Sequence, residues 1–320
     1  MNKVDTLIID KTGTITEGKP SLKEYKSFGK LNDEEILKLA ASIDSNSEHP
    51  LAGAIVKGAK DKNMQLEKLE NFEAITGKGV KAIYQGKKIG FGNQKLLEDF
   101  KASLENDKKQ LVEKLQQTGQ TVMYLLLEDK VEGIVSVTDK IKNTSAKAIQ
   151  ELQKLGVKVI MLTGDNEFTA KAVAGELKLD DFKADCLPDD KYNKVKELQK
   201  QNHVVAMAGD GINDAPALAQ ANIGIAMGTG TDIAMQSAKI TLVKGDLNGI
   251  VRAKILSHEV MKNIKQNLIF AFIYNTLGVP IAAGLLYPFF GILLSPMIAA
   301  AAMSFSSVSV ITNALRLRRK

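Results

Sequence analysis

Short apolar runs alternate with helical patterns over much of the 320-residue chain. Runs rich in β-branched residues, the composition of buried strands, occur at 3–9, 157–162, 204–208, 223–226 and 240–243. Between them, residues 144–155 and 189–201 show the spacing of amphipathic helices. Strands that alternate with helices predict a parallel, doubly wound α/β sheet.

The pattern changes after the first strand. Helical spacing at 33–45 precedes short strands that are separated by glycines, and a helix at 105–117 closes the segment. This pattern predicts an inserted α+β domain, in which helices pack on an antiparallel sheet. We therefore expect an α/β domain made of residues 1–20 and 126–265, interrupted by a second domain at 21–125.

Residues 266–315 contain no Asp, Glu, Lys, Arg or His. About 20 apolar residues span a bilayer core, and a buried core helix is the alternative only for much shorter uncharged stretches. This tract therefore predicts two transmembrane helices, at 268–287 and 291–315, with Pro288 at the break between them.

Basic residues flank the uncharged tract. Lys262 and Lys265 precede it, and residues 316–320 form a basic tail. Positive residues accumulate on the cytoplasmic side of membrane proteins. We therefore expect a multi-pass protein of the cell membrane whose soluble domains, and both of whose ends, are cytoplasmic.

Charge and cysteine content argue against several classes of protein. Four of the 43 basic residues lie in the last five positions, so the rest of the chain nearly balances its 37 acidic residues. This balance argues against nucleic acid as a partner, because phosphate contacts need a basic face. Cys186 is the only cysteine, which excludes an internal disulfide framework and a Cys-x-x-Cys motif. The first residues lead directly into a strand, so no signal peptide is expected.

Polar motifs follow three of the predicted strands. They are Asp-Lys-Thr-Gly-Thr at 10–14, Thr-Gly-Asp-Asn at 163–166 and Gly-Asp-Gly-Ile-Asn-Asp at 209–214. Ligands bind at the carboxyl ends of the strands in parallel sheets. We therefore expect these three motifs to form one site.

Asp10 is placed to act as a nucleophile toward phosphorus, since a carboxylate at a strand end can form an aspartyl phosphate. The charge on a transferred phosphoryl group requires a divalent metal ion and hydrogen-bond donors. Asp10 and Asp210 offer carboxylates of the kind that Mg²⁺ prefers. Thr163 and Lys191 offer donors. Either aspartate alone could simply cap a turn, but the three motifs together favour a phosphoryl-transfer site.

The sequence resembles the P-type ATPases. Residues 10–16, Asp-Lys-Thr-Gly-Thr-Ile-Thr, look like the phosphorylation signature of that family, and the motifs at 163–165 and 209–214 match its later motifs in the same order. The resemblance implies a haloacid-dehalogenase-like phosphorylation domain that is interrupted by a nucleotide-binding domain. It also implies that Asp10 is phosphorylated, with ATP as the phosphate donor and Mg²⁺ as the cofactor.

The resemblance implies roles for further residues of these motifs. Thr12, through its backbone carbonyl, and Asp210 would bind Mg²⁺ together with Asp10. Lys191 matches the family's lysine that neutralises the phosphate. The other catalytic positions are Lys11, Thr163, Gly164, Asp165, Asn213 and Asp214, of which the last two match hinge residues.

Thr12 separates this chain from the phosphatases of the wider superfamily. Those enzymes usually have a second aspartate, a general acid/base, two residues after the nucleophile, where this chain has Thr12. Without that base an aspartyl phosphate should persist, as the intermediate of a pump must.

The inserted domain offers candidates for binding the nucleotide. Residues 13–20 fit a P-loop pattern except at Pro20, which has no hydroxyl for Mg²⁺. Ser-Glu-His-Pro at 47–50 resembles a motif of the heavy-metal P-type ATPases. A neutral histidine can stack on adenine or hydrogen-bond to it. Glycines let the backbone approach a nucleotide. The expected nucleotide-binding residues are Glu48, His49, Gly77, Gly79, Gly92 and Asn93. A purely structural His49 is the alternative.

Polar groups inside the uncharged tract are candidates for an ion path. Tyr-Asn and Met-Ser-Phe-Ser-Ser segments look like signatures of the monovalent copper transporters, and the expected path residues are Tyr274, Asn275, Met303 and Ser307. A methionine thioether is a soft ligand that suits Cu(I), and the tract has no carboxylate for a hard ion. Helix packing is the alternative, and softness alone does not separate copper from silver.

A complete heavy-metal pump also has earlier membrane spans and an actuator domain, which this sequence does not contain. We therefore expect the catalytic half of a copper(I)-exporting P-type ATPase, with membrane lipid, an amino-terminal half and a copper chaperone as partners. The first alternative is a truncated, membrane-anchored copper-responsive or scaffold protein that does not pump. The second is a soluble-type phosphatase, which Thr12 and the uncharged tract disfavour.

Overall fold

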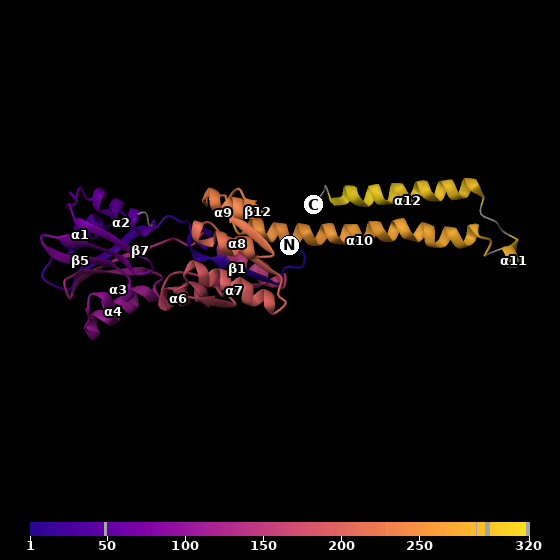
Figure 1. Cartoon of the computed structure of the whole chain (residues 1–320). Coiled ribbons are helices and arrows are strands. Elements are labelled where there is room, and N and C mark those ends of the chain that lie inside the picture. The colour runs from indigo at the N-terminus through magenta and orange to yellow at the C-terminus, as the bar shows by residue number, and fades with distance from the viewer. Residues whose placement is uncertain (48–49, 229, 286, 292–294, 318–320) are drawn as a thin grey trace. The chain divides into compact units, whose positions relative to one another are not determined.

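The computed structural model describes residues 1–47, 50–228, 230–285, 287–291 and 295–317 (Figure 1). The chain divides into two compact units, one formed by residues 4–250 and the other by residues 251–320 together with residues 1–3. The larger unit contains two six-stranded sheets, and the smaller unit is helical.

The first sheet is parallel and has the strand order β12-β11-β10-β1-β8-β9. Its strands are β1 (Thr6–Asp10), β8 (Lys158–Leu162), β9 (Asp181–Lys183), β10 (Val205–Gly209), β11 (Ile223–Met227) and β12 (Ile240–Leu242). Every residue of β1 is buried, as expected for a central strand that is covered on both faces. The parallel, doubly wound sheet predicted from the sequence is confirmed, whereas the sequence pattern does not predict the short edge strand β9.

Helices pack against this sheet. The helices are α5 (Ser145–Lys154), α6 (Glu167–Leu177), α7 (Pro188–Lys200), α8 (Ala215–Gln220) and α9 (Asp232–Ser237). Apolar residues of α7, α8 and α9 share one core with β1, β8 and β10. Because β1 pairs in parallel with both β8 and β10, the carboxyl ends of these three strands meet at one edge of the sheet.

The second sheet is antiparallel, has the order β2-β7-β6-β5-β4-β3 and lies between two layers of helices. Its strands are β2 (Ser21–Ser27), β3 (Glu70–Ile75), β4 (Gly79–Tyr84), β5 (Lys87–Gly92), β6 (Thr121–Leu127) and β7 (Lys130–Thr138). The helices are α1 (Asp33–Asp44) and α2 (Pro50–Asp61) on one face, and α3 (Gln94–Asp99) and α4 (Asn106–Gln117) on the other. Met123 and Leu125 belong to the first core, while Tyr124 and Leu126 belong to the second.

The inserted domain continues beyond the boundary at residue 125 that the sequence suggests. β7 lies between β2 and β6 in the antiparallel sheet, so the domain extends to Thr138. Most residues of β6 and β7 are buried, because helices cover both faces of their sheet. Their long apolar runs therefore resemble those of a parallel sheet, and this resemblance hides the domain boundary.

The remaining helices are α10 (Asn248–Ala282), α11 (Tyr287–Phe290) and α12 (Pro296–Arg316). α10 begins well before residue 268, because helical structure continues through the charged residues that precede the uncharged tract. It contains Pro280 and ends near Gly284, whose φ of +89° is left-handed, so the predicted break at Pro288 is displaced. Among the residues that the structure describes, no helix is both long and apolar enough to cross a membrane.

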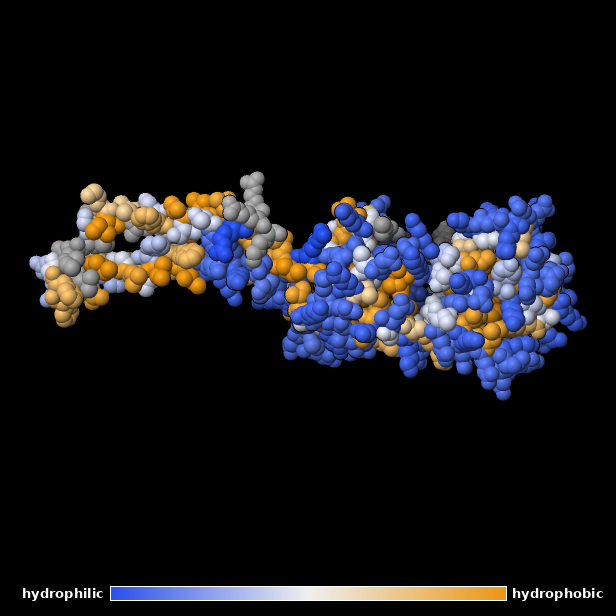
Figure 2. All heavy atoms as spheres, turned by 180° about the vertical axis from the view of Figure 1, so that it is seen from behind, coloured by the Kyte–Doolittle hydropathy of each residue, from blue (hydrophilic) through white to orange (hydrophobic). Residues whose placement is uncertain are grey.

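α10 and α12 lie side by side (Figure 1), and three asparagines join them. Asn263 Nδ2 donates to the carbonyl of Asn313 at 2.7 Å, and Asn313 Nδ2 donates to Asn267 Oδ1 at 2.9 Å. Asn263 and Asn313 are buried, whereas many large apolar side chains of both helices are exposed, as the orange surface of these helices in Figure 2 shows. Polar contacts therefore link α10 and α12 where Asn263 and Asn267 face Asn313. Residues 318–320 of the predicted basic tail lie outside the described residues.

Candidate active site

Asp10 ends β1 and is followed by an irregular turn, Lys11–Ile15. Gly13 in this turn has a φ of +69°, a left-handed conformation that favours glycine. A Cβ atom on Gly13 would overlap the carboxylate of Asp210, the residue that follows β10. Glycine at position 13 therefore allows the turn after Asp10 to approach Asp210.

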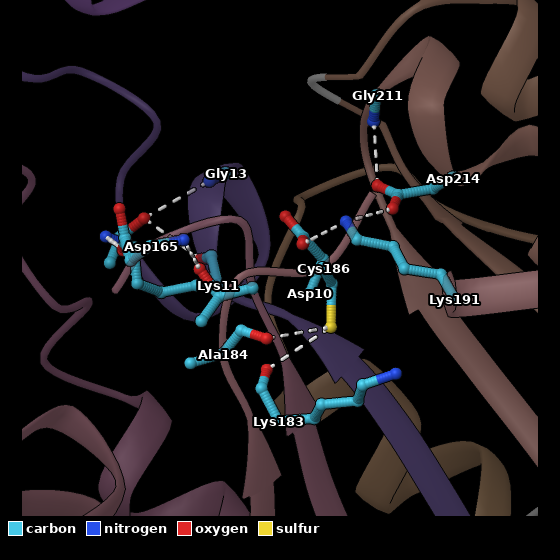
Figure 3. A network of polar contacts seen from close by, with 12 residues as sticks. Asp10, Lys11, Gly13, Asp165, Lys183, Ala184, Cys186, Lys191, Gly211 and Asp214 are labelled. Carbon is cyan, nitrogen blue, oxygen red and sulfur yellow. Dashed lines mark hydrogen bonds and ion pairs between the residues drawn. The ribbon is translucent and has the colours of Figure 1, made fainter. Parts of the chain in front are cut away.

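Lys191 joins two carboxylates beside this turn (Figure 3). Its Nζ lies 2.5 Å from Asp10 Oδ1 and 2.7 Å from Asp214 Oδ1. All three side chains are buried. Lys191 lies in the first turn of α7, where the carboxylate of Asp190 accepts a hydrogen bond from the amide of Leu187 and so caps the helix.

Burial controls the protonation of these groups. Burial raises the pKa of Asp10 to about 7, with contributions from Asp214 and Asp210, although Lys191 opposes the shift. Burial and Asp214 likewise raise the pKa of Asp210 to about 6. Burial disfavours the charged form of Lys191, but Asp10 and Asp214 outweigh it and raise the pKa of this lysine. Lys191 is therefore charged at neutral pH, among carboxylates that are poorly solvated.

Asp10, Asp210 and Asp214 form a group that fits a hard divalent cation. One oxygen of each carboxylate lies within 4.8 Å of the others. Mg²⁺ prefers such oxygens and usually takes one or two carboxylates together with water and phosphate. Asp214 is an addition to the predicted metal ligands, and the available signal is that it ends the same motif, residues 209–214, that contains Asp210.

Lys11 and Asp165 form a second ion pair, in which Lys11 is buried and Asp165 is half-buried (Figure 3). Asp165 also accepts a hydrogen bond from the hydroxyl of Thr121 at 3.1 Å. Its pKa is lowered, because Lys11 and the hydrogen bonds outweigh the effect of burial. The ammonium of Lys11 is thus directed to Asp165, and Lys191 is the ammonium that contacts Asp10.

The motif at 163–165 lies beside Asp10, as the sequence predicts. Leu162 is the parallel partner of Asp10 in the sheet, so Thr163 directly follows the neighbouring strand end. Thr163 is buried, and its hydroxyl accepts a hydrogen bond from the amide of Asp165 at 3.1 Å, whereas Gly164 is exposed.

Two of the predicted site residues, Thr12 and Asn213, are not buried. Thr12 is half-buried within the turn after Asp10, where its backbone carbonyl is the predicted ligand. Asn213 is exposed, and the ion pairs of the site involve its neighbour Asp214 instead.

The predicted glycines of the inserted domain lie where β4 and β5 pair. Gly79 and Gly92 are direct partners in the sheet. A Cβ atom on Gly92 would overlap the carbonyl of Lys78, and one on Gly79 would overlap the carbonyl of Phe91. The close approach of β4 and β5 therefore requires both glycines, independently of any role in nucleotide binding.

The other predicted nucleotide-binding residues lie near this glycine pair or outside the described structure. Asn93 follows β5, and its Nδ2 donates to the carbonyl of Gly77 at 2.8 Å. Glu48 and His49 lie outside the described residues.

Asp44, the last residue of α1, is a buried carboxylate that the sequence analysis does not identify. It is 6% exposed, and burial raises its pKa to about 7. It lies three residues before the motif at 47–50. Its signal is an acidic residue in a helix whose neighbouring positions, Leu39 to Ile43, are buried and mostly apolar.

The predicted copper-path residues occupy two helices. Tyr274 and Asn275 lie in α10, and Met303 and Ser307 lie in α12. Met303 is exposed, and the hydroxyl of Ser307 donates to its carbonyl at 3.3 Å within the helix. The side chain of Asn275 lies outside the described part of the chain, and among the described residues no hydrogen bond links the pair in α10 with the pair in α12.

Comparison with known proteins agrees with this geometry. Residues 4–222 match the family of haloacid dehalogenase-like hydrolases. Over 99% of its length the chain is 56% identical to a copper-transporting P-type ATPase of Rhizobium leguminosarum bv. viciae. It is 49% identical, again over 99% of its length, to a silver exporting P-type ATPase of Salmonella typhimurium. The chain belongs to the heavy-metal P-type ATPases.

Solved P-type ATPase structures share the fold of this chain. A zinc-transporting PIB-type ATPase in its E2.Pi state is 37% identical, with a TM-score of 0.68 over 99% of this chain and 50% of that one. The catalytic domain of the CPx-ATPase CopB-B is 30% identical, with a TM-score of 0.63 over 79% of this chain and 89% of that one. This P-type ATPase chain spans only 38% of the length of each of the two curated relatives.

Proposed function

We propose that this chain is the catalytic half of a P-type ATPase that exports copper(I) through an aspartyl phosphate on Asp10. The observation that carries the proposal is the buried contact between Lys191 and Asp10, at the strand edge that also holds Asp210 and Asp214. A carboxylate that is paired with an ammonium and lies beside a candidate cation site is arranged to accept a phosphoryl group.

In the proposed reaction Asp10 attacks the γ-phosphorus of ATP. A bond forms between the carboxylate oxygen and phosphorus, and the bond from phosphorus to the ADP oxygen breaks. Lys191 then interacts with the new phosphoryl oxygens while it keeps its contact with Asp214, because the charge beside it remains negative. Mg²⁺, held by Asp10, Asp210 and the carbonyl of Thr12, would neutralise charge on the phosphate when bound.

Hydrolysis of the aspartyl phosphate needs a base to take a proton from water, and neither Thr12 nor Lys191 can act as that base. Thr12 stands two residues after the nucleophile, and its hydroxyl is too weakly basic to take a proton from water. Lys191 is charged and cannot accept a proton. We propose that an amino-terminal half, as the partner of this chain, supplies the group that completes the cycle.

The inserted domain is proposed to bind ATP. Gly77, Gly79, Gly92 and Asn93 would present backbone groups to the nucleotide, and Glu48 and His49 would contact the base. The pairing of Gly79 with Gly92 and the hydrogen bond from Asn93 to Gly77 support this placement, because they hold these four residues close together.

Residues 266–315 are proposed to lie in the lipid of a cell membrane, with the larger unit in the cytoplasm. The absence of charge across this tract and the exposure of its large apolar side chains support the proposal. Tyr274, Asn275, Met303 and Ser307 would form part of a Cu(I) path, with a copper chaperone as a candidate donor. Silver, another soft monovalent ion, fits the same ligands.

Labelling with radioactive ATP and Mg²⁺ tests the proposed chemistry. The chain should take up phosphate that hydroxylamine releases, as it does from acyl phosphates, and the label should decay slowly. Asp10→Asn should abolish labelling, while the exposed control Asp129→Asn should leave it intact. Labelling should not depend on Cu(I) until the amino-terminal half is added, after which decay should accelerate.

The alternatives give different outcomes in the same experiment. Rapid, steady hydrolysis of small phosphoesters would favour a phosphatase. Binding of copper without any label on Asp10, in the presence of the amino-terminal half, would favour a membrane-anchored copper-responsive or scaffold protein.

A further inference from the structure

One loop of the larger unit contacts both the turn after Asp10 and the segment that leads into α10. The loop connects β7 to α5 and includes Lys142 and Thr144. Neither residue belongs to the motifs that carry the proposed chemistry.

Lys142 contacts three backbone carbonyls. Its Nζ lies 2.5 Å from the carbonyl oxygen of Gly13, 3.1 Å from that of Thr14 and 2.9 Å from that of Gly245. An ammonium group has three N–H donors, so these three acceptors can use all of them. Hydrogen bonds from a charged donor are stronger than those between neutral groups, and the side chain is half-buried.

Another group of the loop and the first residue of α5 reinforce the contact with the turn after Asp10. The amide of Lys142 donates to the carbonyl of Ile15 at 3.0 Å, and the hydroxyl of Ser145 donates to the same carbonyl at 2.7 Å. The loop therefore binds the carbonyls of three consecutive residues, Gly13, Thr14 and Ile15.

The contact with the α10 segment is also reinforced. The hydroxyl of Thr144 donates to Asp246 Oδ1 at 3.1 Å. The same oxygen of Asp246 accepts a hydrogen bond at 2.9 Å from the amide of Asn248, the first residue of α10. Gly245, which Lys142 binds, directly precedes Asp246.

We propose that Lys142 is a positioning residue for phosphoryl transfer, which fixes the turn after Asp10 and joins that turn to the start of α10. This inference rests on the proposed function, because the turn is proposed to carry the phosphorylated aspartate. The carbonyl of Thr12, a proposed Mg²⁺ ligand, directly precedes Gly13. Loss of the ammonium should therefore displace this ligand without disturbing the pairing of Gly79 with Gly92 in the inserted domain.

Hydrogen exchange of the whole chain tests the link itself. In Lys142→Met, exchange should become faster in residues 11–15 and in the first turn of α10. In Thr144→Val, it should become faster at the start of α10 alone. Lys140→Met is the matched control, because Lys140 is exposed on the same loop, with its Nζ 3.8 Å from a carboxylate oxygen of Glu17. Faster exchange spread evenly over the larger unit would show that Lys142 only stabilises the fold, and would overturn the proposal.

Labelling at varied Mg²⁺ and ATP concentrations tests the positioning role. In Lys142→Met the Mg²⁺ concentration for half-maximal labelling should rise about tenfold, equivalent to about 1.4 kcal/mol, while that for ATP stays unchanged. Lys142→Arg keeps the charge and should recover most of the shift. Equal shifts for Mg²⁺ and ATP, or no shift, would contradict the proposal. If the unmodified chain takes no label, the proposed function fails, and the exchange experiment still decides the Lys142 link.

Discussion

Lys191 Nζ lies 2.5 Å from Asp10 Oδ1, although the two residues are 181 positions apart in the sequence. The contact forms because β1 ends at Asp10 and the capped first turn of α7 begins beside the same sheet edge. Asp10 is buried, and two further carboxylates lie nearby. The ion pair with Lys191 therefore stabilises the ionised carboxylate of Asp10.

Replacement of Lys191 by methionine tests whether ionised Asp10 depends on the Lys191 ammonium. At pH 8 the variant should lose about 3 kcal/mol of unfolding free energy, because a buried carboxylate is left without its cation. The loss should shrink toward pH 5, since the pKa of Asp10 is already raised to about 7 and the carboxylate can take up a proton. Denaturation in detergent at both pH values measures the difference. Lys194→Met, which removes a more exposed ion pair on the same helix, should change stability by less than about 1 kcal/mol.

The strands of the phosphorylation domain and the location of its site could be predicted from sequence for a physical reason. Strands buried on both faces leave continuous apolar runs, and motifs that follow such strands must meet at one edge of a parallel sheet. Asp10, Thr163 and Asp210 follow from this rule. The ion pair between Lys11 and Asp165 does not, because side-chain pairing between distant strand ends leaves no periodic signal.

Local composition does not predict the end of the inserted domain or the beginning of α10. β7 has the apolar composition of a parallel strand but pairs with β2 and β6 in the antiparallel sheet. α10 continues from charged into uncharged sequence, so a change of composition did not mark its beginning. In both cases pairing partners or helix continuity, rather than local composition, set the boundary.

Asp44 should make the stability of the chain depend on pH. Its pKa of about 7 in the folded state exceeds the ordinary value of 3.8. The folded state therefore keeps this proton between about pH 4 and 7, where the unfolded state has lost it, and unfolding free energy falls as pH rises through that window. Asp44→Asn should stabilise the chain at pH 8, by up to about 4 kcal/mol, and have little effect near pH 4. Thermal unfolding at both pH values, with the exposed control Asp61→Asn, checks this; equal effects of the two variants would contradict it.

The boundaries of the inserted domain predict which piece of the chain folds alone. Residues 20–139 contain all six strands of the antiparallel sheet and should fold. Residues 21–125 end within β6 and lack β7, the strand between β2 and β6, so β2 loses its partner. Circular dichroism and cooperative unfolding of the two pieces distinguish these outcomes. Cooperative folding of the shorter piece would show that β7 is dispensable.

The same piece, residues 20–139, tests the proposed nucleotide site. It should bind ATP in calorimetry without Mg²⁺, because the proposed metal ligands lie in the other domain. His49→Gln should weaken binding about tenfold, or about 1.4 kcal/mol, through the loss of a base contact. Lys57→Gln is the control, because Lys57 is exposed and is not among the predicted nucleotide-binding residues. Unchanged affinity in His49→Gln would favour a structural histidine.

Met303 provides the sharpest test of the transported ion. Met303→Ile keeps an apolar side chain of similar size but removes the thioether, which is the soft ligand that suits Cu(I). Copper resistance conferred by the chain together with its amino-terminal half should fall, while membrane insertion and labelling of Asp10 in the isolated chain stay normal. Met297→Ile is the matched control, because Met297 is an exposed methionine of the same helix outside the predicted path. Equal loss of resistance in both variants would mean that methionine packing in α12, rather than a ligand at position 303, supports export. Full resistance in Met303→Ile would remove Met303 from the path, and a selective loss of silver resistance would reassign the ion.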